Sequence, residues 1–374
     1  MSPAGPLVLF AGGGTGGHLY PGLAIARALV REQPAVRPFF IGAVRGIERE
    51  VLPTTEFPHQ LLPLHPLYRR QPWNNWRTLV GGVQAWRAIS RLTRDDRPAA
   101  VVGTGGYAAG VALAWARARG IATFLHEPDS HPGLTTRLFA GGARGVFLGF
   151  PEASAQLAVA SPEVVYPLGC PIDEPPAGDA ARAAARAEAR AEWGLPDDAF
   201  VVLVMGGSQG ARAINEVVDQ WVARGLPRSM ALIWSTGRAQ AAAYLHRESE
   251  VVKVRPYLSP ISQAYAAADV ALGRAGAMSI AELCAWGLPM LLVPLPTAAQ
   301  DHQTFNAQAT AAAGAGVMLR QADLSVDGLS AQLTAWQQDN AVLVRMRDAA
   351  LARARPTAAR DIARTLCTLL QLTR

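Results

Sequence analysis

The sequence predicts an α/β protein made of two doubly wound domains, each with a parallel β-sheet. A short apolar run at residues 7–10 ends in glycines and precedes a helical segment at 21–31, and this strand–turn–helix order recurs along the chain. The pattern restarts at residues 200–205, again followed by a glycine turn, Gly206-Gly-Ser-Gln-Gly210. A length of 374 residues suits two domains of roughly 100–200 residues each.

Each expected element is an apolar or amphipathic run bounded by turn residues. In the first half we expect strands at residues 7–10, 38–41, 99–102 and 122–125, with helices at 21–31 and 111–119. In the second half we expect strands at 200–205, 231–234, 251–254, 270–272 and 290–293. The alanine- and arginine-rich run 180–193 is expected to be a solvated helix. The loop-like stretch from Gly169 to Asp173 divides the chain into domains of residues 1–168 and 169–355.

The composition fits a globular protein with an anionic partner. Half of the residues are hydrophobic and 17% are charged, which allows two sizeable cores. The net charge of +6 suits phosphate, nucleotide or acidic lipid. The three cysteines are far apart and form no zinc-binding pattern, which indicates a reducing cytosolic compartment. We expect no signal peptide and no transmembrane helix, so any membrane contact would be peripheral.

The first chemical motif is Gly12-Gly-Gly-Thr-Gly-Gly-His18. Its glycines allow backbone N–H groups to approach an anion at a helix start. A dinucleotide site would also need an acidic residue about 20 positions on, at the end of the second strand, but Glu48 comes too late. A P-loop is excluded because no Gly-Lys-Ser/Thr follows. His18 either caps and packs the helix start or accepts a proton from a sugar hydroxyl.

Two further motifs follow strands of the first half and should lie at the same sheet edge as His18. They are Gly103-Thr-Gly-Gly-Tyr107 and His126-Glu-Pro-Asp-Ser130. Ligands of open α/β sheets bind at this edge. The His126–Glu127 pair could orient an acceptor or move a proton, or it could form a local hydrogen-bonded turn.

The second half carries three more candidate motifs. Glycine turns precede helices at Gly206–Arg212 and Gly273–Glu282, and Asp301-His-Gln-Thr-Phe-Asn306 follows a strand and loop. Helix N-termini that face a diphosphate supply positive potential without a metal ion. Glu282 could accept both hydroxyls of a ribose, and the amides of Gln303 and Asn306 could bind a sugar.

In this order, the motifs resemble the MurG family, bacterial N-acetylglucosaminyltransferases that convert lipid I into lipid II. The resemblance covers nearly the whole chain. It implies the GT-B fold, in which two Rossmann-like domains enclose a cleft, with inversion at the anomeric carbon and no metal or other cofactor. A C-terminal helix at about 356–374 would pack back on the first, acceptor- and membrane-facing domain. The second domain would bind the UDP-sugar donor.

The resemblance also implies the site residues. His18 is the preferred general base, with Glu127 and Asp129 as alternatives. Leu258 would meet the uracil through its backbone, and Gln303 would bind the N-acetylglucosamine. The acceptor and its diphosphate would be bound by Thr15, Gly16, Gly17, Gly105, Gly106, Tyr107 and His126. UDP-N-acetylglucosamine would be bound by Thr15, Gly16, Gly17, Asp129, Ser208, Gln209, Gly210, Leu258, Ala277, Met278, Ser279, Ile280, Ala281, Glu282, Gln303 and Asn306.

The sequence departs from the family pattern at three places, which leaves alternatives open. Pro128-Asp129 replaces Gln-Asn, Asp173 replaces an arginine, and His302 replaces the first of two glutamines. One alternative is a GT-B transferase that acts on another glycolipid. A second is UDP-N-acetylglucosamine 2-epimerase, which would need neither the first glycine loop nor an apolar membrane face. A third is a non-catalytic nucleotide-sugar scaffold, suggested by Asp129 and Asp173.

A tryptophan- and arginine-rich stretch is the expected membrane contact. Residues 64–80 lead into a probable helix to about residue 94, and an apolar stripe begins at Trp76 and Leu79. The alternative is that this stripe packs on the sheet. The candidate membrane residues are Tyr68, Arg69, Arg70, Trp73, Trp76 and Leu79. The resemblance implies UDP-N-acetylglucosamine, lipid I, anionic lipid and other cell-wall synthesis proteins as partners, no nucleic acid, and a place at the cytoplasmic face of the bacterial membrane.

Overall fold

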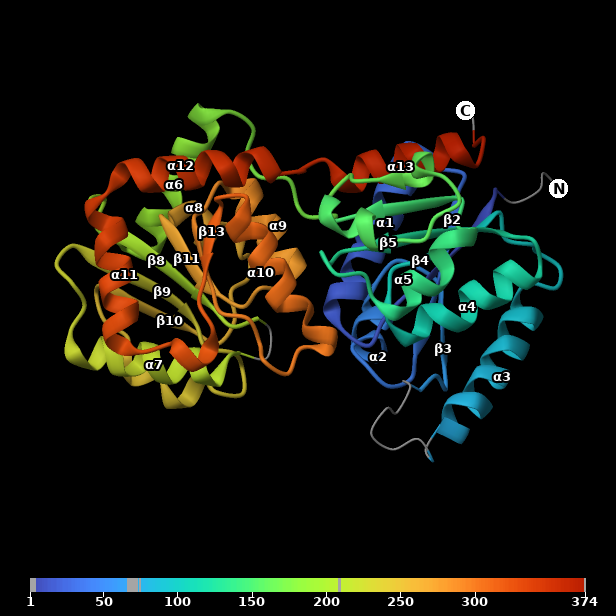
Figure 1. Cartoon of the computed structure of the whole chain (residues 1–374), viewed down its shortest axis with the longest axis horizontal. Helices are drawn as coiled ribbons and strands as arrows, with labels where there is room; N and C mark the ends of the chain where they lie inside the picture. Colours follow the sequence, from blue (N-terminus) through green and yellow to red (C-terminus); the bar gives the residue numbers. More distant parts are fainter. Residues whose placement is uncertain (1–4, 66–72, 74, 208–209, 373–374) are drawn as a thin grey trace. The chain divides into compact units, whose positions relative to one another are not determined.

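The computed structural model describes residues 5–65, 73, 75–207 and 210–372. The chain forms two compact units, drawn together in Figure 1. Unit 1 contains residues 1–172 and 357–374, and unit 2 contains residues 173–356. The chain therefore passes from one unit to the other twice, at residues 172–173 and at 356–357.

Unit 1 is a parallel sheet of seven strands in the order β3-β2-β1-β4-β5-β6-β7. The strands are β1 (Leu7–Ala11), β2 (Arg37–Ala43), β3 (His59–Leu62), β4 (Ala100–Gly103), β5 (Ala122–Glu127), β6 (Gly145–Leu148) and β7 (Val165–Tyr166). The helices are α1 (Gly16–Glu32), α2 (Glu48–Val51), α3 (Asn75–Leu92), α4 (Gly106–Ala118), α5 (Leu134–Phe139) and α13 (Ala358–Leu369).

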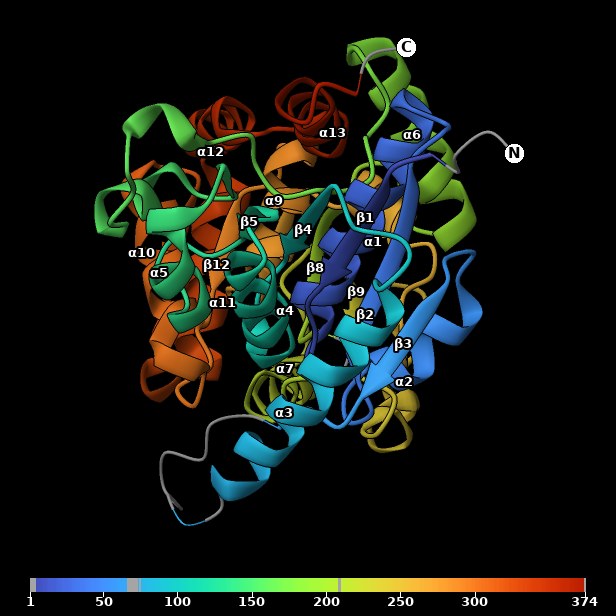
Figure 2. The same ribbon diagram turned by 90° about the vertical axis from the view of Figure 1, so that its right-hand side faces the viewer.

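Alternate residues of β1 build the cores on the two faces of this sheet. Val8 and Phe10 pack with α1 and α13, whereas Leu7 and Leu9 pack with α4. Such a continuous apolar run is typical of a parallel strand that is covered on both sides. Figures 1 and 2 show α13 beside α1, and α3 at the periphery of unit 1 beside α4.

Unit 2 is a parallel sheet of six strands in the order β10-β9-β8-β11-β12-β13. The strands are β8 (Phe200–Met205), β9 (Met230–Ser235), β10 (Val252–Arg255), β11 (Val270–Gly273), β12 (Met290–Leu292) and β13 (Gly316–Met318). The helices are α6 (Asp179–Trp193), α7 (Arg212–Arg224), α8 (Ser262–Ala267), α9 (Ala277–Trp286), α10 (His302–Ala312), α11 (Val326–Gln338) and α12 (Asn340–Arg353). The two-domain, parallel-sheet prediction is confirmed.

Two helices begin earlier than the sequence pattern predicted. Helix α1 begins at Gly16 rather than Pro21, because the carbonyl of Thr15 already accepts hydrogen bonds from the N–H groups of His18 and Leu19. Pro21 lies inside the helix, where it removes only one hydrogen bond near the N-terminus. Helix α4 begins at Gly106 rather than at residue 111. Both glycine motifs therefore supply the first turn of a helix as well as the loop before it.

Candidate functional site

Three loops meet at the carboxyl edge of the unit 1 sheet. They follow the neighbouring strands β1, β4 and β5, as the sequence predicted. A side chain on Gly106, whose φ is +73°, would collide with the carbonyl oxygen of Gly13, so the first two loops lie in backbone contact. The hydroxyl of Thr135 donates to the carbonyl oxygen of Gly106 at 3.1 Å and ties the third loop to the second.

His18 lies in the first turn of α1 with its ring oriented by the loop before it. The Nδ1 atom lies 3.2 Å from the carbonyl oxygen of Gly13 and 3.3 Å from Oγ1 of Thr15. A carbonyl can only accept, so we assign the Nδ1–H tautomer to the neutral ring, which leaves the lone pair on Nε2. A Cβ on Gly105 would lie 2.9 Å from Nε2, which explains why glycine is required beside the ring.

The start of α1 is suited to an anion. Thr15 and Gly17 are exposed, and Gly16 and His18 are partly exposed. The first N–H groups of a helix have no partner within the helix and carry the positive end of its dipole. Thr15, Gly16 and Gly17 therefore lie together with His18 on an accessible surface.

His126 and Glu127, which the sequence predicts to contact a ligand, are both buried. His126 is 0% exposed, and burial lowers its pKa to about 4, with the nearby His18 adding to the effect. The backbone of Gly169 opposes this shift, although neither ring nitrogen has hydrogen-bond geometry with a described residue. The buried Glu127 accepts from the N–H groups of Asp129 and Gly133 and from Thr136 Oγ1. These residues form a local hydrogen-bonded turn, the alternative raised by the sequence.

Burial changes the pKa of the Glu127 carboxyl group. Its pKa is raised to about 7, first by burial and then by the charge of Asp129, while its three hydrogen bonds oppose the shift. Asp129 is partly exposed near the start of the same loop. Of the two alternative bases, Asp129 is therefore the one that has an accessible surface.

Tyr107 supports the first glycine loop instead of pointing freely at an acceptor. Its hydroxyl donates to the carbonyl oxygen of Arg45 at 2.7 Å. A Cβ on Gly14 would lie 3.0 Å from the Tyr107 ring, so the ring packs on the loop. On another side of the loop, the buried Glu48 accepts the N–H of Gly14 at 2.9 Å. The sequence considered Glu48 only as a ribose ligand for a dinucleotide.

In unit 2, Glu282 lies in α9 and keeps part of its surface exposed. The hydroxyl of the buried Tyr265 donates to Glu282 Oε2 at 2.6 Å. Burial raises the pKa of Glu282, the Tyr265 hydrogen bond lowers it, and the charge of Asp173 raises it further. Sequence reasoning missed Tyr265, because the packing of α8 on α9 brings it to Glu282 and no local motif marks it.

The other unit 2 residues that the resemblance assigns to the donor also lie at the carboxyl edge of the unit 2 sheet. Gly210 follows β8, Leu258 follows β10, and α9 begins after β11. The residues at the start of α9 are Ala277, Met278, Ser279, Ile280 and Ala281, of which Ile280 directs its side chain into the core. Ser208 and Gln209 lie outside the described residues.

Gln303 and Asn306 of α10 already have protein partners. Gln303 is partly exposed, and its Oε1 accepts the N–H of Leu295 at 2.9 Å. Asn306 is completely buried, and its Nδ2 donates to the carbonyl oxygen of Ala275 at 3.2 Å. Contact between Asn306 and a sugar stays a prediction. The hydrogen bond to Ala275 ties α10 to the loop before α9.

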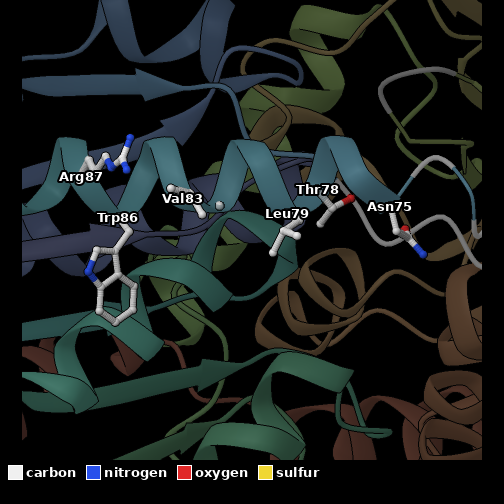
Figure 3. Close-up of a pocket in the computed structure, with 7 residues that line it drawn as sticks. Asn75, Thr78, Leu79, Val83, Trp86 and Arg87 are labelled. Atoms are coloured by element: carbon white, nitrogen blue, oxygen red, sulfur yellow. The ribbon is translucent and has the colours of Figure 1, made fainter.

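The first half of α3 carries apolar side chains on its surface. Trp76 and Leu79 are 59% and 71% exposed, and Val80 and Val83 are exposed as well. Trp73, just before α3, is 70% exposed. The buried residues of α3 are Gly81, Ala85 and Ile89, so most of the predicted stripe does not pack on the sheet. A cavity of about 480 Å³ is lined by seven residues of α3, namely Asn75, Thr78, Leu79, Gly82, Val83, Trp86 and Arg87. In Figure 3, Leu79 and Trp86 point to one side of α3 and Arg87 to the other. Tyr68, Arg69 and Arg70 lie outside the described residues.

Two negative findings apply to the part of the chain that the structure describes. No helix there is long and apolar enough to cross a membrane. Within the same residues, no group of three or more His, Cys, Asp or Glu side chains is arranged to hold a metal ion.

The class of protein follows from these loops and from two family matches. The glycosyltransferase family 28 N-terminal domain matches residues 8–148. The glycosyltransferase family 28 C-terminal domain matches residues 201–365. Together with two parallel-sheet domains, these matches define a glycosyltransferase with the GT-B fold.

Similar proteins of known name show which family of glycosyltransferases the chain belongs to. A protein of Chlorobaculum parvum is 38% identical over 363 residues, which cover 95% of this chain and 97% of its own. One of Moorella thermoacetica is 37% identical over 332 residues, which cover 85% and 86%. Both are named UDP-N-acetylglucosamine--N-acetylmuramyl-(pentapeptide) pyrophosphoryl-undecaprenol N-acetylglucosamine transferase. The crystal structure of Acinetobacter baumannii MurG aligns with a TM-score of 0.74 and 26% identity over 98% of this chain and 100% of that one. The chain belongs to the MurG family.

Proposed function

We propose that the chain transfers N-acetylglucosamine from UDP-N-acetylglucosamine to the C4 hydroxyl of N-acetylmuramic acid in lipid I. The products are lipid II and UDP. The observation that carries this proposal is the glycine loop with His18 at the start of α1, in a chain that belongs to the MurG family. The loop offers backbone N–H groups to the acceptor diphosphate, and the histidine offers a lone pair to the reacting hydroxyl.

The reaction is a direct displacement at the anomeric carbon. The acceptor oxygen forms a bond to C1, the bond from C1 to the phosphate oxygen breaks, and the configuration inverts. The proton of the hydroxyl moves to Nε2 of His18, and the electron pair leaves with UDP. Because the Nδ1 contact with Gly13 fixes the tautomer, Nε2 is the nitrogen that can accept. Helix N-termini stabilise the charge of the leaving diphosphate without a metal ion.

The donor is held by unit 2. Glu282 accepts hydrogen bonds from the ribose hydroxyls, and Tyr265 keeps its carboxylate in position. The backbone at Ala277, Met278 and Ser279 binds the diphosphate at the start of α9. Leu258 meets the uracil through its backbone, and Gln303 contacts the N-acetylglucosamine beside Leu295. Ser208, Gln209 and Gly210 complete the phosphate loop.

The lipid acceptor stays in the bilayer, so unit 1 must contact the membrane. The exposed Trp73, Trp76 and Leu79 support α3 as the contact, because apolar side chains on a surface prefer the lipid interface. The guanidinium of Arg77 lies over the ring of Trp76, 5.5 Å from its centre, and adds positive charge beside the apolar patch. The protein would therefore be peripheral, at the cytoplasmic face of a bacterial membrane with anionic lipid.

One assay tests the reaction and separates it from the alternatives. The protein receives UDP-N-acetylglucosamine and a water-soluble, short-chain lipid I analogue, and both UDP and disaccharide are measured. Equal release of UDP and disaccharide is the expected result. Interconversion of the UDP-sugar without acceptor would indicate an epimerase, and donor binding without turnover would indicate a scaffold. Activity should persist after full chelation of divalent metal ions, and strict metal dependence would overturn the account of leaving-group stabilisation.

A further inference from the structure

Glu48 is a buried acidic residue that the reaction described above does not use. It is the first residue of α2 and is 0% exposed. Its Oε1 accepts the N–H of Gly14 at 2.9 Å and lies 3.4 Å from the N–H of Ala43. Its Oε2 is buried and has no hydrogen-bond partner among the described residues. Burying a carboxylate oxygen without a hydrogen-bond partner costs folding free energy, so a buried group of this kind calls for an explanation.

Glycines make the space for this carboxylate. A side chain on Gly13 would collide with Oε1, and a side chain on Gly46 would collide with Oε2. Gly46 has a φ of +136°, a conformation that other residues rarely adopt. The carboxylate is therefore enclosed between the first glycine loop and the turn that leads from β2 to α2.

The contact with Gly14 leads directly to His18. The N–H of Gly14 and the carbonyl of Gly13 belong to one planar peptide group. Glu48 Oε1 accepts from the N–H side of this group at 2.9 Å, and His18 Nδ1 donates to its carbonyl side at 3.2 Å. A single peptide group thus separates the carboxylate from the histidine. Hydrogen bonds in such a chain polarise one another, so the carboxylate makes the Gly13 oxygen a stronger acceptor.

We propose that Glu48 is a positioning residue, which orients the His18 ring and fixes its tautomer through the peptide group between Gly13 and Gly14. A carboxylate commonly holds a histidine by direct contact with its N–H. Here the peptide group between Gly13 and Gly14 transmits the same constraint from the carboxylate to the ring. The glycines of the loop carry no side chain that would keep an anion away from the start of α1. This proposal rests on the role of His18 in the proposed function.

The contact between Glu48 and Gly14 also affects which backbone N–H groups can bind the acceptor diphosphate. The N–H of Gly14 is occupied by Glu48, so it does not serve a phosphate oxygen. The negative charge behind the loop also disfavours a diphosphate at that end. The N–H groups of Gly16 and Gly17 at the start of α1 remain the ones that face an anion.

The test is a double-mutant cycle with Glu48→Ala and His18→Ala. With the full-length protein, UDP-N-acetylglucosamine and the soluble lipid I analogue, Glu48→Ala should lower kcat by roughly 10- to 100-fold, as loss of such an outer partner typically does. The KM for the donor should stay close to the wild-type value, since Glu282 and the loops of unit 2 that are proposed to hold the donor are unchanged. In the His18→Ala background, Glu48→Ala should have no further effect on kcat. An equal loss in both backgrounds would overturn the proposal.

A near-isosteric variant and a spectroscopic readout keep the test independent of folding and of activity. Glu48→Gln retains an acceptor for the Gly14 N–H and should recover most of the kcat that Glu48→Ala loses. In ¹⁵N NMR of the imidazole, His18 should be the Nδ1–H tautomer in the wild-type protein and a mixture in Glu48→Ala. An unchanged tautomer in a folded Glu48→Ala protein would overturn the proposal. A wild-type protein that shows the Nδ1–H tautomer but forms no disaccharide would overturn the proposed function alone.

Discussion

The Nδ1 atom of His18 lies 3.2 Å from the carbonyl oxygen of Gly13, and this contact decides which ring nitrogen can accept a proton. The loop and the helix are consecutive in the chain, so the histidine is oriented by the same motif that offers N–H groups to an anion. In the proposed reaction, proton acceptance by His18 and anion binding at the start of α1 would therefore be coupled through a few residues of backbone.

His18→Ala should reduce kcat by roughly 10²–10⁴-fold, because a general base contributes about that much. The KM for UDP-N-acetylglucosamine should change little, which steady-state kinetics with the soluble acceptor analogue can measure. Asp129→Ala is the matched variant. If kcat stays near normal in His18→Ala and falls in Asp129→Ala, the base is Asp129.

Glu282→Ala should raise the KM for the UDP-sugar by roughly 10- to 150-fold, because a charge-assisted hydrogen bond contributes about 1.5–3 kcal/mol. Tyr265→Phe removes only the 2.6 Å hydrogen bond to Glu282 and should raise the same KM by roughly 3- to 10-fold. Titration calorimetry with UDP gives an independent measure of donor affinity. An unchanged KM in a folded Glu282→Ala protein would remove Glu282 from the donor site.

Glu127 should make the stability of unit 1 depend on pH. Its folded-state pKa of about 7 lies above the ordinary value of 4.5, so its contribution is fully present below pH 4.5 and is lost as the pH rises through 7. The shift corresponds to roughly 3 kcal/mol. Relative to Glu127→Gln, the wild-type free energy of unfolding should therefore fall between pH 4.5 and 8.

Denaturant unfolding of both proteins at several pH values checks this difference. His126 titrates in both proteins, so its own lowered pKa of about 4 largely cancels. The opposite outcome is a difference between the two unfolding free energies that does not change with pH. In that case Glu127 would already be ionised in the folded protein above pH 4.5, and its pKa would not be raised.

Trp76→Ser combined with Leu79→Ser should weaken binding to anionic vesicles by roughly tenfold or more. Burying one large apolar side chain contributes about 1.5–3 kcal/mol, and both side chains are exposed on α3. Leu245→Ser is the matched control, because Leu245 is an exposed leucine of unit 2. Vesicle co-sedimentation measures binding, and turnover of the soluble acceptor analogue should survive.

The segment before α3 can be tested with Trp73→Ser, Arg69→Glu and Arg70→Glu in one protein. Losing the ring and reversing both charges should weaken the same vesicle binding. Co-sedimentation equal to wild type for both this protein and the α3 variant would exclude the surface.

The apolar central strand β8 was predictable, whereas the short edge strands β3, β7 and β13 were not. The run at residues 200–205 forms β8 with those limits because it is apolar throughout and lies in the centre of its sheet. In contrast, β7 has two residues and β13 begins with glycine, and both lie at sheet edges. Such strands form because a neighbouring strand pairs with them, and no local pattern records this.

The candidate site could also be predicted only in part from the sequence. The glycine motifs revealed three loops at one sheet edge, because the carboxyl ends of parallel strands must meet there. Glu48 and Tyr265 were not assigned to a site, since their roles depend on contacts that arise only after β1 pairs with β2 and α8 packs on α9. His126 and Asn306 were assigned to ligands because polar residues in a motif suggest contact, but both are completely buried.

Helix α13 has a consequence for the order in which the two units mature during translation. Its side chains Ile362, Ala363 and Leu366 are completely buried in the same core cluster as Val8 and Phe10. On the ribosome, residues 173–356 are synthesised before these three residues exist, so unit 2 has its whole sequence first. Unit 1 therefore keeps one apolar face uncovered until α13 is synthesised. A nascent chain paused near residue 356 would expose that face to chaperones.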